Sequence, residues 1–380
     1  MVYIGALLIS MFLAQCSQKQ TNRFQKTMWA IGSGLPLFLV SALRYNVGTD
    51  YYFTYLKSYF LNDKLFYFEP GFETMYRLFR SVNAHYQWIF IISSLLIASF
   101  VFLGIYRQSP SPAFSIFLYA TSTYYFIGMN AVRQFIAMSI CLYAMAYLTK
   151  KNGWWKYAAF VGVAALFHTS ALIMLIMLVL NLIPIKRITL ALGGVLTILG
   201  YFVLKYGKPF LTRIPRFGGY FGSTFDENSF EFIYFGISLA VFVFALLFYR
   251  EAHENPYYSV HFKSVMMSLI LLSYSAEIPL MKRIAWYFAL SQIILIPIVL
   301  QSISQNMQRF WKVCIVGSYS LMCVVGIGFF NKQECLPYQT FLGQSQHEVR
   351  LECYRRYAGF EKISFRNEDV MGSKNQDYIL

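Results

Sequence analysis

Charged residues are scarce in this chain of 380 residues, which has 17 acidic and 32 basic side chains. Only 13% of the residues are charged, against about 25% in a typical soluble domain, while 57% are hydrophobic. This balance excludes an ordinary soluble domain and predicts a polytopic membrane protein. The net charge of +15 would suggest a nucleic-acid partner in a soluble protein. Here the basic residues lie between apolar runs, as orientation in a membrane requires, so no nucleic acid is expected.

Motifs for metals, cofactors and secretion are missing as well. Neither C-x-x-C nor H-E-x-x-H occurs, and the two G-x-G pairs lie in apolar segments with no preceding strand. No metal and no cofactor are therefore expected. The apolar segment 2–16 has no positive n-region and no A-x-A-like cleavage site, so it is interpreted as a retained first helix. The chain also shows no internal repeat.

Apolar runs suited to a bilayer fill most of the chain. A spanning helix needs roughly 20 apolar residues, with a lower limit near 17. The runs are 2–16, 28–43, 88–106, 112–128, 132–148, 152–168, 169–185, 188–204, 232–249, 264–280, 284–300 and 313–330. The fold class expected is all-α, a transmembrane bundle of about 12 spans over residues 1–330. Two polar inserts, 44–87 and 205–231, interrupt it, and a polar tail follows over 331–380.

The density of lysine and arginine in short loops predicts the orientation, because cytoplasmic loops are enriched in these residues. The density contrast favours an outer amino terminus, which places both inserts and the tail on the periplasmic side. The stretch 152–185 is short for two spans, but "FHTSA" at 167–171 is a plausible turn with hydroxyl side chains that can cap a helix. A single tilted helix there would leave eleven spans and reverse every later loop, so the hairpin is preferred.

Six cysteines fall into two groups. Cys16, Cys141, Cys314 and Cys323 lie in or beside apolar runs and are interpreted as small buried hydrophobes. Cys335 and Cys353 lie in the tail. If the tail faces an oxidising compartment, a disulfide between these two is the hypothesis.

Polar side chains beside apolar runs gather on the outer side in this topology. Ionisable groups at membrane depth are costly and point to function by default. They are Arg44, Asp50, Glu69, Glu73, Arg133, Gln134, His168, Glu277, Lys282 and Arg283.

Two of the arginines are expected at the amino-terminal ends of helices. Arg133 follows Asn130, the expected N-cap, and Arg283 follows Pro279. A cation is unfavourable at the positive end of a helix unless an anion binds there, and arginine binds phosphate in bidentate fashion. Both are therefore candidates for diphosphate binding. Arg44 is a third candidate, but it ends an outgoing helix, where a cation also suits the macrodipole for purely structural reasons.

The acid–base candidates are His168 and Asp50. His168 is interpreted as the only histidine at an apolar boundary. It can move a proton near neutral pH, or it can be a hydrogen-bonded polar side chain at a helix junction without a catalytic role. Asp50 can act as the base, cap a turn or pair with Arg44. Glu69 and Glu73 can bind sugar hydroxyls, together with Gln134, or be solvated.

Tyrosines cluster in the same outer segments. Anchoring in the aromatic belt at the membrane surface is the expected role of most of them, although aromatic faces also stack on sugars. They are Tyr45, Tyr51, Tyr52, Tyr55, Tyr59, Tyr67, Tyr76, Tyr86, Tyr124 and Tyr125.

Five of these stretches together resemble the EpsG family, which belongs with the Wzy-type polymerases of O-antigen, capsule and exopolysaccharide. They are "RYNVGTDYYFTY" (44–55), "EPGFE" (69–73), "NAVRQFIAMSICLYAMAYL" (130–148), "FHTSALI" (167–173) and "RIAWYF" (283–288). The resemblance runs from Arg44 to about Phe288 and is most specific at "VRQ-x-I-A" and "F-H-x-S-A".

The resemblance implies a reaction and a location. A glycan on undecaprenyl diphosphate is transferred to the non-reducing sugar of another lipid-linked repeat unit, at the periplasmic face of the bacterial inner membrane. The implied partners are the undecaprenyl-diphosphate-linked oligosaccharide, membrane lipid and a chain-length regulator. A GT-C-like fold is expected by analogy alone.

Three other functions remain open at this stage. A transporter (flippase) of the lipid-linked oligosaccharide is disfavoured, because transporters tend to show internal repeats and broken helices and this sequence signals neither. An O-antigen ligase would use the same donor, and only the "VRQ" and "FHTS" blocks favour the polymerase over it. A peripheral scaffold would not need arginines at helix ends.

Overall fold

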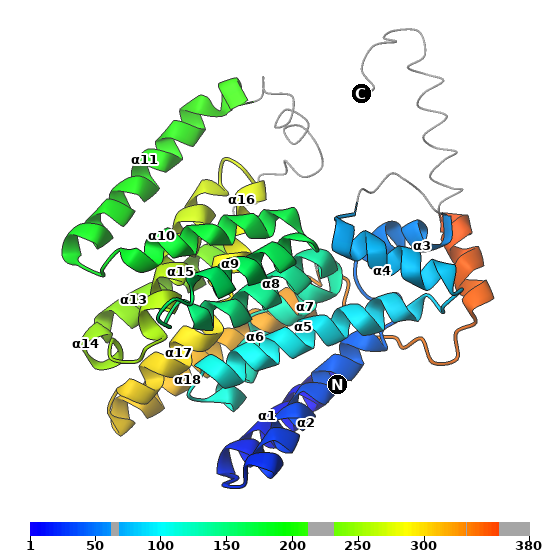
Figure 1. Cartoon of the computed structure of the whole chain (residues 1–380), viewed down its shortest axis with the longest axis horizontal. Helices are drawn as coiled ribbons and strands as arrows, with labels where there is room; N and C mark the ends of the chain where they lie inside the picture. Colours follow the sequence, from blue (N-terminus) through cyan, green and yellow to red (C-terminus); the bar gives the residue numbers. More distant parts are fainter. Residues whose placement is uncertain (62–67, 212–231, 332, 357–380) are drawn as a thin grey trace.

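The computed structural model describes residues 1–61, 68–211, 232–331 and 333–356 (Figure 1). These residues form helices and connecting loops without a β-strand; the nearest feature to a strand pair is an isolated antiparallel bridge between Arg44 and Thr340. The all-α prediction is therefore confirmed for this part of the chain. Most of the predicted outer loop 205–231 lies outside the described residues.

The first half of the chain folds into short and medium helices. They are α1 (Val2–Lys19), α2 (Arg23–Ala42), the π-helix η1 (Tyr51–Leu56), α3 (Lys57–Leu61), α4 (Pro70–Ser81), α5 (Gln87–Gln108), α6 (Pro112–Thr121), α7 (Tyr124–Asn130), α8 (Val132–Ala144), the 3₁₀ turn η2 (Met145–Tyr147), α9 (Trp154–Ala165), the 3₁₀ segment η3 (Thr169–Leu175) and α10 (Ile176–Leu182).

The second half completes the bundle. Its helices are α11 (Arg187–Leu211), α13 (Phe232–Leu247), α14 (Tyr249–Ala252), α15 (Tyr258–Tyr274), α16 (Leu280–Ala289), α17 (Gln292–Ser302), α18 (Gln305–Cys323) and the π-helix η5 (Val324–Phe329). Each predicted apolar run overlaps one helix or two consecutive helices. Residues 346–356 form a last helical segment beside α3 and α4 (Figure 1).

Four helices within the described residues are long and apolar enough to cross a membrane. They are Gln87–Gln108, Arg187–Gly207, Leu280–Ser302 and Gln305–Phe329. Pro112–Thr121, Val132–Tyr147, Thr169–Leu182 and Ile233–Leu247 are apolar but shorter. The protein is thus a helical, membrane-type chain, and the count of 12 crossings stays a prediction.

The stretch 152–185 is a hairpin and not one long helix. α9 ends at Ala165, and the backbone of His168 is extended before η3 begins. The two arms then run back to the same end, where the Asn181 Nδ2 donates to the Leu148 carbonyl oxygen at 3.0 Å. Neither hydroxyl of "FHTSA" caps the next helix, because its N-cap is His168 and the Ser170 Oγ instead donates to the Tyr287 hydroxyl at 3.1 Å.

One predicted span is broken, contrary to the expectation from the sequence. α6 and α7 are separated by Ser122 and Thr123, and Thr123 adopts the left-handed conformation with φ 68°. A β-branched residue there is strained. Leu290 and Ser291 lie between α16 and α17, but both keep right-handed helical backbone angles, so Leu280–Ser302 remains one continuous apolar segment. The absence of broken helices can therefore no longer be used against a transporter.

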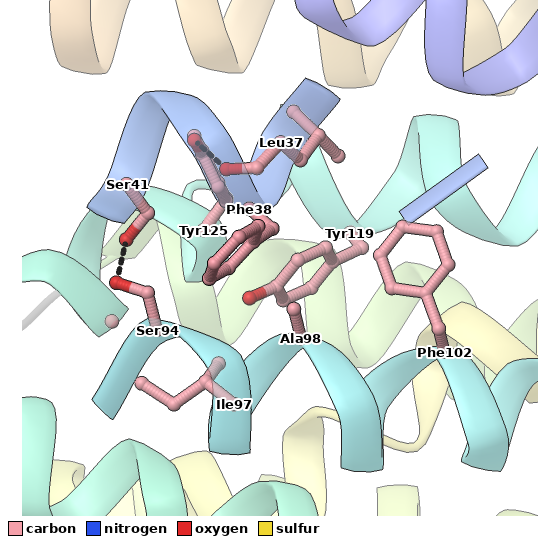
Figure 2. Close-up of a pocket in the computed structure, with 10 residues that line it drawn as sticks. Leu37, Phe38, Ser41, Ser94, Ile97, Ala98, Phe102, Tyr119 and Tyr125 are labelled. Carbon is pink, nitrogen blue, oxygen red and sulfur yellow. Dashed lines mark hydrogen bonds between the residues drawn. The ribbon is translucent and has the colours of Figure 1, made fainter. Parts of the chain in front are cut away.

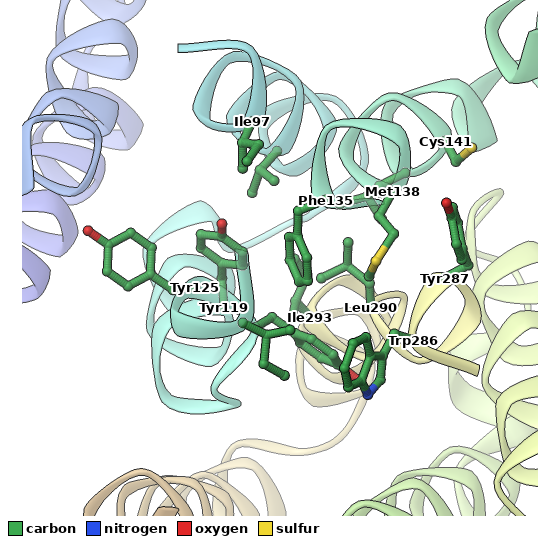
Figure 3. Packing of buried hydrophobic residues seen from close by; sticks show 14 of the residues in the cluster. Ile97, Tyr119, Tyr125, Phe135, Met138, Cys141, Trp286, Tyr287, Leu290 and Ile293 are labelled. Atoms are coloured by element: carbon green, nitrogen blue, oxygen red, sulfur yellow. The ribbon is translucent and has the colours of Figure 1, made fainter. Parts of the chain in front are cut away.

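Figure 3 shows a part of the buried core in which side chains of α8 pack beside Leu290 and the start of α17. Phe135 and Met138 on α8 are at most 1% exposed, and they face Leu290 and Ile293, which are fully buried. Full burial of each such side chain contributes about 1.5–3 kcal/mol. This packing holds the first half of α8 against the α16–α17 junction.

Backbone hydrogen bonds join the described part of the tail to the loop after α2. The Tyr45 amide donates to the Gln339 carbonyl oxygen at 2.9 Å, and the Phe341 amide donates to the Leu43 carbonyl oxygen at 3.0 Å. The Tyr3 hydroxyl donates to the Cys335 carbonyl oxygen at 2.9 Å. The amino terminus, this loop and the tail therefore lie at one end of the molecule.

The hypothesis of a disulfide in the tail is wrong for this structure. Cys335 and Cys353 are both free thiols. Cys335 is 0% exposed and its Sγ is directed to the Gln333 carbonyl oxygen at 3.4 Å, while Cys353 is buried in the helical segment 346–356. Each thiol is buried in its own surroundings, and the two sulfur atoms are not bonded to each other.

Candidate functional site

Glu69 lies at the centre of a charged cluster at the end of the molecule that carries the 44–61 loop. One carboxylate oxygen, Oε2, accepts from the Arg133 Nη1 at 2.5 Å. The other, Oε1, is 2.7 Å from the His168 Nδ1. The Glu69 side chain is 12% exposed, and those of Arg133 and His168 are 21% and 25% exposed. The structure therefore joins three stretches of sequence around one partly accessible carboxylate.

The "EPGFE" stretch is folded so that Glu69 reaches this position. Pro70 is the first residue of α4, where its fixed φ suits a helix and its missing amide is not needed. The Gly71 amide donates to the Leu166 carbonyl oxygen at 2.8 Å, and a Cβ on Gly71 would lie 2.9 Å from that oxygen. Phe72 is fully buried beside them. The start of α4 is thus pinned to the turn that carries His168.

Arg133 is the second residue of α8, so its expected place at a helix start is confirmed. The expected cap is wrong: the N-cap is Ala131, and Asn130 is the last residue of α7. The Asn130 amide Nδ2 instead donates to the Gln333 carbonyl oxygen at 3.0 Å. The Glu69 carboxylate supplies the anion that favours a cation at this helix end.

Gln134 joins α8 to α16. Its Nε2 donates to the backbone carbonyl oxygen of Arg283 at 2.6 Å, and the side chain is 3% exposed. The Oε1 of Gln134 is buried without a hydrogen-bond partner among the described residues. Because Arg283 is the fourth residue of α16, this bond ties together the two helix starts that carry Arg133 and Arg283.

Asp50 belongs electrostatically to the same cluster. Burial raises the pKa of Asp50 above its ordinary value, while the charges of Arg283 and Arg133 and a hydrogen bond with Thr54 oppose that rise. For Glu69 the balance goes the other way. Burial raises its pKa, but the hydrogen bond with His168 and the charge of Arg133 prevail and lower it to about 2. The site thus holds one firmly ionised carboxylate and one that protonates more readily.

Arg44 does not join the cluster. It is 1% exposed, its Nη1 donates to the Ser41 carbonyl oxygen at 2.6 Å, and its Nη2 donates to the Met129 carbonyl oxygen at 3.1 Å. Its guanidinium also lies 4.7 Å from the ring centre of Phe90. This geometry favours the structural interpretation of Arg44, because backbone carbonyls and an aromatic face occupy the group that would bind a diphosphate.

A small apolar pocket lies beside Arg44, between α2 and α5 (Figure 2). Ser41 and Ser94 bound its polar end through a hydrogen bond of 2.8 Å. The remaining lining is apolar or aromatic, and it comprises Leu37, Phe38, Ile97, Ala98, Phe102, Tyr119, Tyr125 and Gly128. The pocket is separate from the charged cluster and contributes no ionisable side chain to it.

Glu73 also turns away from Glu69. Its carboxylate accepts from the Arg77 Nε at 2.8 Å, in an (i, i+4) pair on the exposed face of α4. The side chain of Arg77 is 77% exposed. Of the eight site residues expected from the sequence, the structure therefore gathers Asp50, Glu69, Arg133, Gln134, His168 and Arg283.

Sequence reasoning missed the aromatic support of the cluster. The ring of Phe68 lies 5.0 Å from the Arg133 guanidinium. The Tyr55 hydroxyl donates to the Asn130 carbonyl oxygen at 2.8 Å and accepts from the Val132 amide at 3.1 Å, bridging the α7–α8 junction. The aromatic run "DYYFTYL" could have indicated this support, but its side chains were assigned to the membrane surface.

That assignment to an aromatic belt is wrong for most of these tyrosines. Tyr51, Tyr55, Tyr76, Tyr86 and Tyr124 are each at most 2% exposed, because they pack inside the molecule. Tyr67 lies outside the described residues.

His168 is not the only histidine among apolar residues. α15 begins at Tyr258, earlier than expected, and places His261 inside the helix and 0% exposed. Its Nε2 lies 3.1 Å from the Gln108 Oε1. His261 therefore contacts a neutral amide, whereas His168 contacts a carboxylate.

Comparison with known proteins identifies the family. The EpsG family model matches residues 28–340. The chain belongs to the EpsG family. No curated protein and no solved structure matches it. The match extends beyond the region of resemblance seen in the sequence and includes Gln339 of the tail, which bonds to the loop after α2.

Membership of the EpsG family, together with the apolar helices, indicates a membrane protein with a role of the polysaccharide-polymerase type. In general terms it points to a glycosyltransferase-like polymerase. The most specific EpsG stretches, "VRQ" and "FHTS", are those that meet at Glu69.

Proposed function

We propose that this EpsG-family protein is a polysaccharide polymerase. It transfers a glycan from undecaprenyl diphosphate onto a lipid-linked repeat unit at the periplasmic face of the bacterial inner membrane. The observation that carries the proposal is the cluster of Arg133, Glu69 and His168, with Asp50 and Arg283 close enough to act on one another's charge. It combines cationic groups for a leaving diphosphate with groups that can accept a proton.

The bond changes are those of a glycosyl transfer. A hydroxyl oxygen of the acceptor sugar bonds to the anomeric carbon of the donor, while the bond from that carbon to the diphosphate oxygen breaks. The electron pair leaves with undecaprenyl diphosphate, and the hydroxyl proton passes to a base of the enzyme. Arg133 and Arg283 stabilise the charge that develops on the leaving diphosphate.

His168 is the base that we favour, with Asp50 as the other candidate. The Nδ1 of His168 is engaged by Glu69, which leaves the Nε2 to face the substrate. Burial raises the pKa of Asp50, which also makes it a better base than an ordinary aspartate. Gln134 acts by holding the starts of α8 and α16 together, which sets the spacing of the two arginines.

The proposed partners follow from the reaction. They are the undecaprenyl-diphosphate-linked oligosaccharide, which arrives laterally from membrane lipid, and a chain-length regulator. The periplasmic location is supported by the density of basic residues in the short loops at the other end. The described tail lies at the same end as the cluster-bearing loop, which agrees with a tail on the periplasmic side.

A transporter of the same lipid-linked oligosaccharide is the second candidate. The break between α6 and α7 favours it, because discontinuous helices are common at transport sites. Charged side chains gathered at one end of the bundle favour the polymerase.

Deletion of the gene followed by analysis of the glycan ladder separates these functions. Loss of a polymerase leaves single repeat units attached to their acceptor, loss of a ligase leaves none attached, and loss of a flippase accumulates the inward-facing intermediate. We expect single repeat units.

Arg133→Lys and Arg283→Lys then test the diphosphate site. Lysine keeps the charge but cannot form the bidentate contact, so we expect elongation to slow about 10²- to 10³-fold at normal protein levels. Arg77→Lys is the matched control, because Arg77 is an exposed arginine of α4 paired with Glu73. Wild-type ladders from both site variants would show that the arginines do not bind the diphosphate.

A further inference from the structure

We infer that Glu69 is a positioning residue that orients His168 as the base and holds Arg133 with its second oxygen. This inference rests on the proposed polymerase function and goes beyond it, because it assigns Glu69 to the protein's own side chains instead of to sugar hydroxyls. One carboxylate then sets the geometry of both the proton acceptor and a diphosphate ligand.

The two oxygens of Glu69 are divided between two partners. Oε1 lies 2.7 Å from the His168 Nδ1 and is also 3.4 Å from the Thr169 amide, while Oε2 accepts from the Arg133 Nη1 at 2.5 Å. A sugar hydroxyl would have to compete with a charged partner at either oxygen. The carboxylate is therefore committed to the protein before any substrate arrives.

The hydrogen bond to Glu69 selects one form of the histidine ring. An ionised carboxylate can only accept hydrogen bonds, so the Nδ1 of His168 must carry the proton in this contact. In the neutral ring the lone pair then lies on the Nε2, on the side away from Glu69. The side chain is 25% exposed, which leaves that nitrogen within reach of a substrate hydroxyl. A carboxylate that fixes the tautomer and stabilises the imidazolium formed in the reaction is a known device of histidine bases.

Glu69 itself is unsuited to be the base. The charge of Arg133 and the hydrogen bond of His168 outweigh burial and lower the pKa of Glu69 to about 2. A carboxylate so weakly basic is a poor proton acceptor near neutral pH. Glu69 is therefore ionised near neutral pH, and its charge lies beside the His168 ring there.

The fold holds Glu69 rigidly for this role. α4 begins directly after it, and the Gly71 amide donates to the Leu166 carbonyl oxygen, two residues before His168. A side chain at Gly71 would collide with that oxygen at 2.9 Å. The carboxylate and the ring it contacts are therefore attached to the same local scaffold, which limits their relative movement.

Glu69→Gln is the decisive substitution, with Glu73→Gln as its matched control on the same helix. The assay is elongation by the purified full chain in detergent micelles, supplied with the lipid-linked repeat units that accumulate in the deletion strain. For Glu69→Gln we expect turnover to fall about 10- to 100-fold, part of the 10²- to 10⁴-fold contribution of a general base, because the amide oxygen still accepts from the ring but no longer stabilises the imidazolium by charge. The KM should not rise, because Arg133 loses a competitor for the diphosphate. Glu69→Asp keeps the charge and should recover part of the rate.

The pH profile gives a readout that a purely structural role would not move. The charged and titratable groups of this site are Glu69 in contact with the His168 ring, Arg133 bonded to Glu69, Tyr287 of α16 bonded to Ser170, and Asp50 and Arg283, which act on each other's charge. Replacement of Glu69 by glutamine removes the negative charge that favours the imidazolium, and Arg133 and Arg283 remain. Because this charge is lost only in Glu69→Gln, the acid limb of the rate profile should move to lower pH in Glu69→Gln and stay in place in Glu73→Gln.

The outcomes distinguish this inference from the proposed function. A raised KM with unchanged turnover would mean that Glu69 binds sugar directly, and an unmoved acid limb would mean that it does not act through His168. Either result overturns the inference while the polymerase assignment stands. If the wild-type protein does not elongate these repeat units at all, and deletion leaves the ladder intact, the proposed function itself has failed.

Discussion

Two histidines among apolar residues, His168 and His261, lie near opposite ends of α8 without being part of this helix. His168 contacts Glu69, which also binds Arg133 at the start of this helix. His261 contacts Gln108, whose Nε2 donates to the Leu142 carbonyl oxygen near the end of the helix. Arg133 and Leu142 are about 13 Å apart along the helix at 1.5 Å per residue. The His168 side chain is 25% exposed and faces a carboxylate, whereas His261 is fully buried and faces an amide.

This difference shows that a polar side chain at a helix end is not by itself evidence of function. Both histidines interrupt apolar sequence, and each lies within hydrogen-bonding distance of a side-chain oxygen. Only His168 combines a charged partner with access to substrate, which proton transfer requires. The pairing partner and the exposure, neither of which sequence displays, separate a candidate base from a core hydrogen bond.

The largest expected effect concerns which end faces outwards. Thr74→Cys on α4 and Lys151→Cys after η2 are both exposed positions at opposite ends of α8. With Cys16, Cys314 and Cys323 replaced by alanine, an impermeant thiol reagent should label Thr74→Cys in intact spheroplasts and Lys151→Cys only after permeabilisation. The reverse pattern would place the charged cluster on the cytoplasmic side and remove the basis for a periplasmic reaction.

The comparison between the histidines is tested directly by alanine at each position. His168→Ala should slow elongation about 10²- to 10⁴-fold, the usual contribution of a general base. His261→Ala should leave elongation per folded molecule close to wild type but lower the stability by about 1–3 kcal/mol, because the Gln108 Oε1 is left buried without a partner. Elongation rates and thermal melting in detergent measure the two effects. Equal losses of rate would mean that both histidines serve only the fold.

A smaller effect is expected from the loop that carries Asp50. Gly48 has φ +103°, and a Cβ there would lie 2.3 Å from the Asn130 Oδ1. Asn130 cannot move aside freely because Gln333 holds its amide. Gly48→Ala should therefore cost about 1–3 kcal/mol of stability. Gly162→Ala on α9, where a Cβ meets open space, is the control and should be neutral or slightly stabilising in the same melting experiment. Equal melting temperatures would show that this loop relaxes without strain.

The sequence was sufficient for the helices and for much of the cluster. Apolar runs located the apolar helices but not η1, α3, α4 or the segment 346–356, which lie in the predicted polar insert and tail. The stretch "FHTSA" located the turn of the hairpin, because α9 ends at Ala165 just before it. Arg133 and Arg283 were expected at helix starts because Asn130 and Pro279 precede them. The structure confirms both starts, although through a different cap at α8.

What the sequence could not supply depends on contacts between distant residues. Glu69 and Glu73 look alike in "EPGFE", and only the docking of α4 onto Leu166 decides which one reaches His168. The break at Thr123 carries no glycine or proline signal, since it is imposed on a β-branched residue by the surrounding core. The tyrosines of η1 were assigned to the membrane surface because burial of a polar ring requires partners that periodicity does not reveal.

The bonds between the tail and the loop after α2 also fix an order of assembly. Leu43 and Arg44 find their partners at Phe341 and Thr340, nearly the whole length of the chain later. During synthesis the amino-terminal hairpin and the central helices can pack while these partners do not yet exist. The loop that bears Asp50 is therefore completed only when the ribosome has almost finished. The arginines and the histidine of the charged cluster are thus synthesised before the tail residues that bond to the loop beside them.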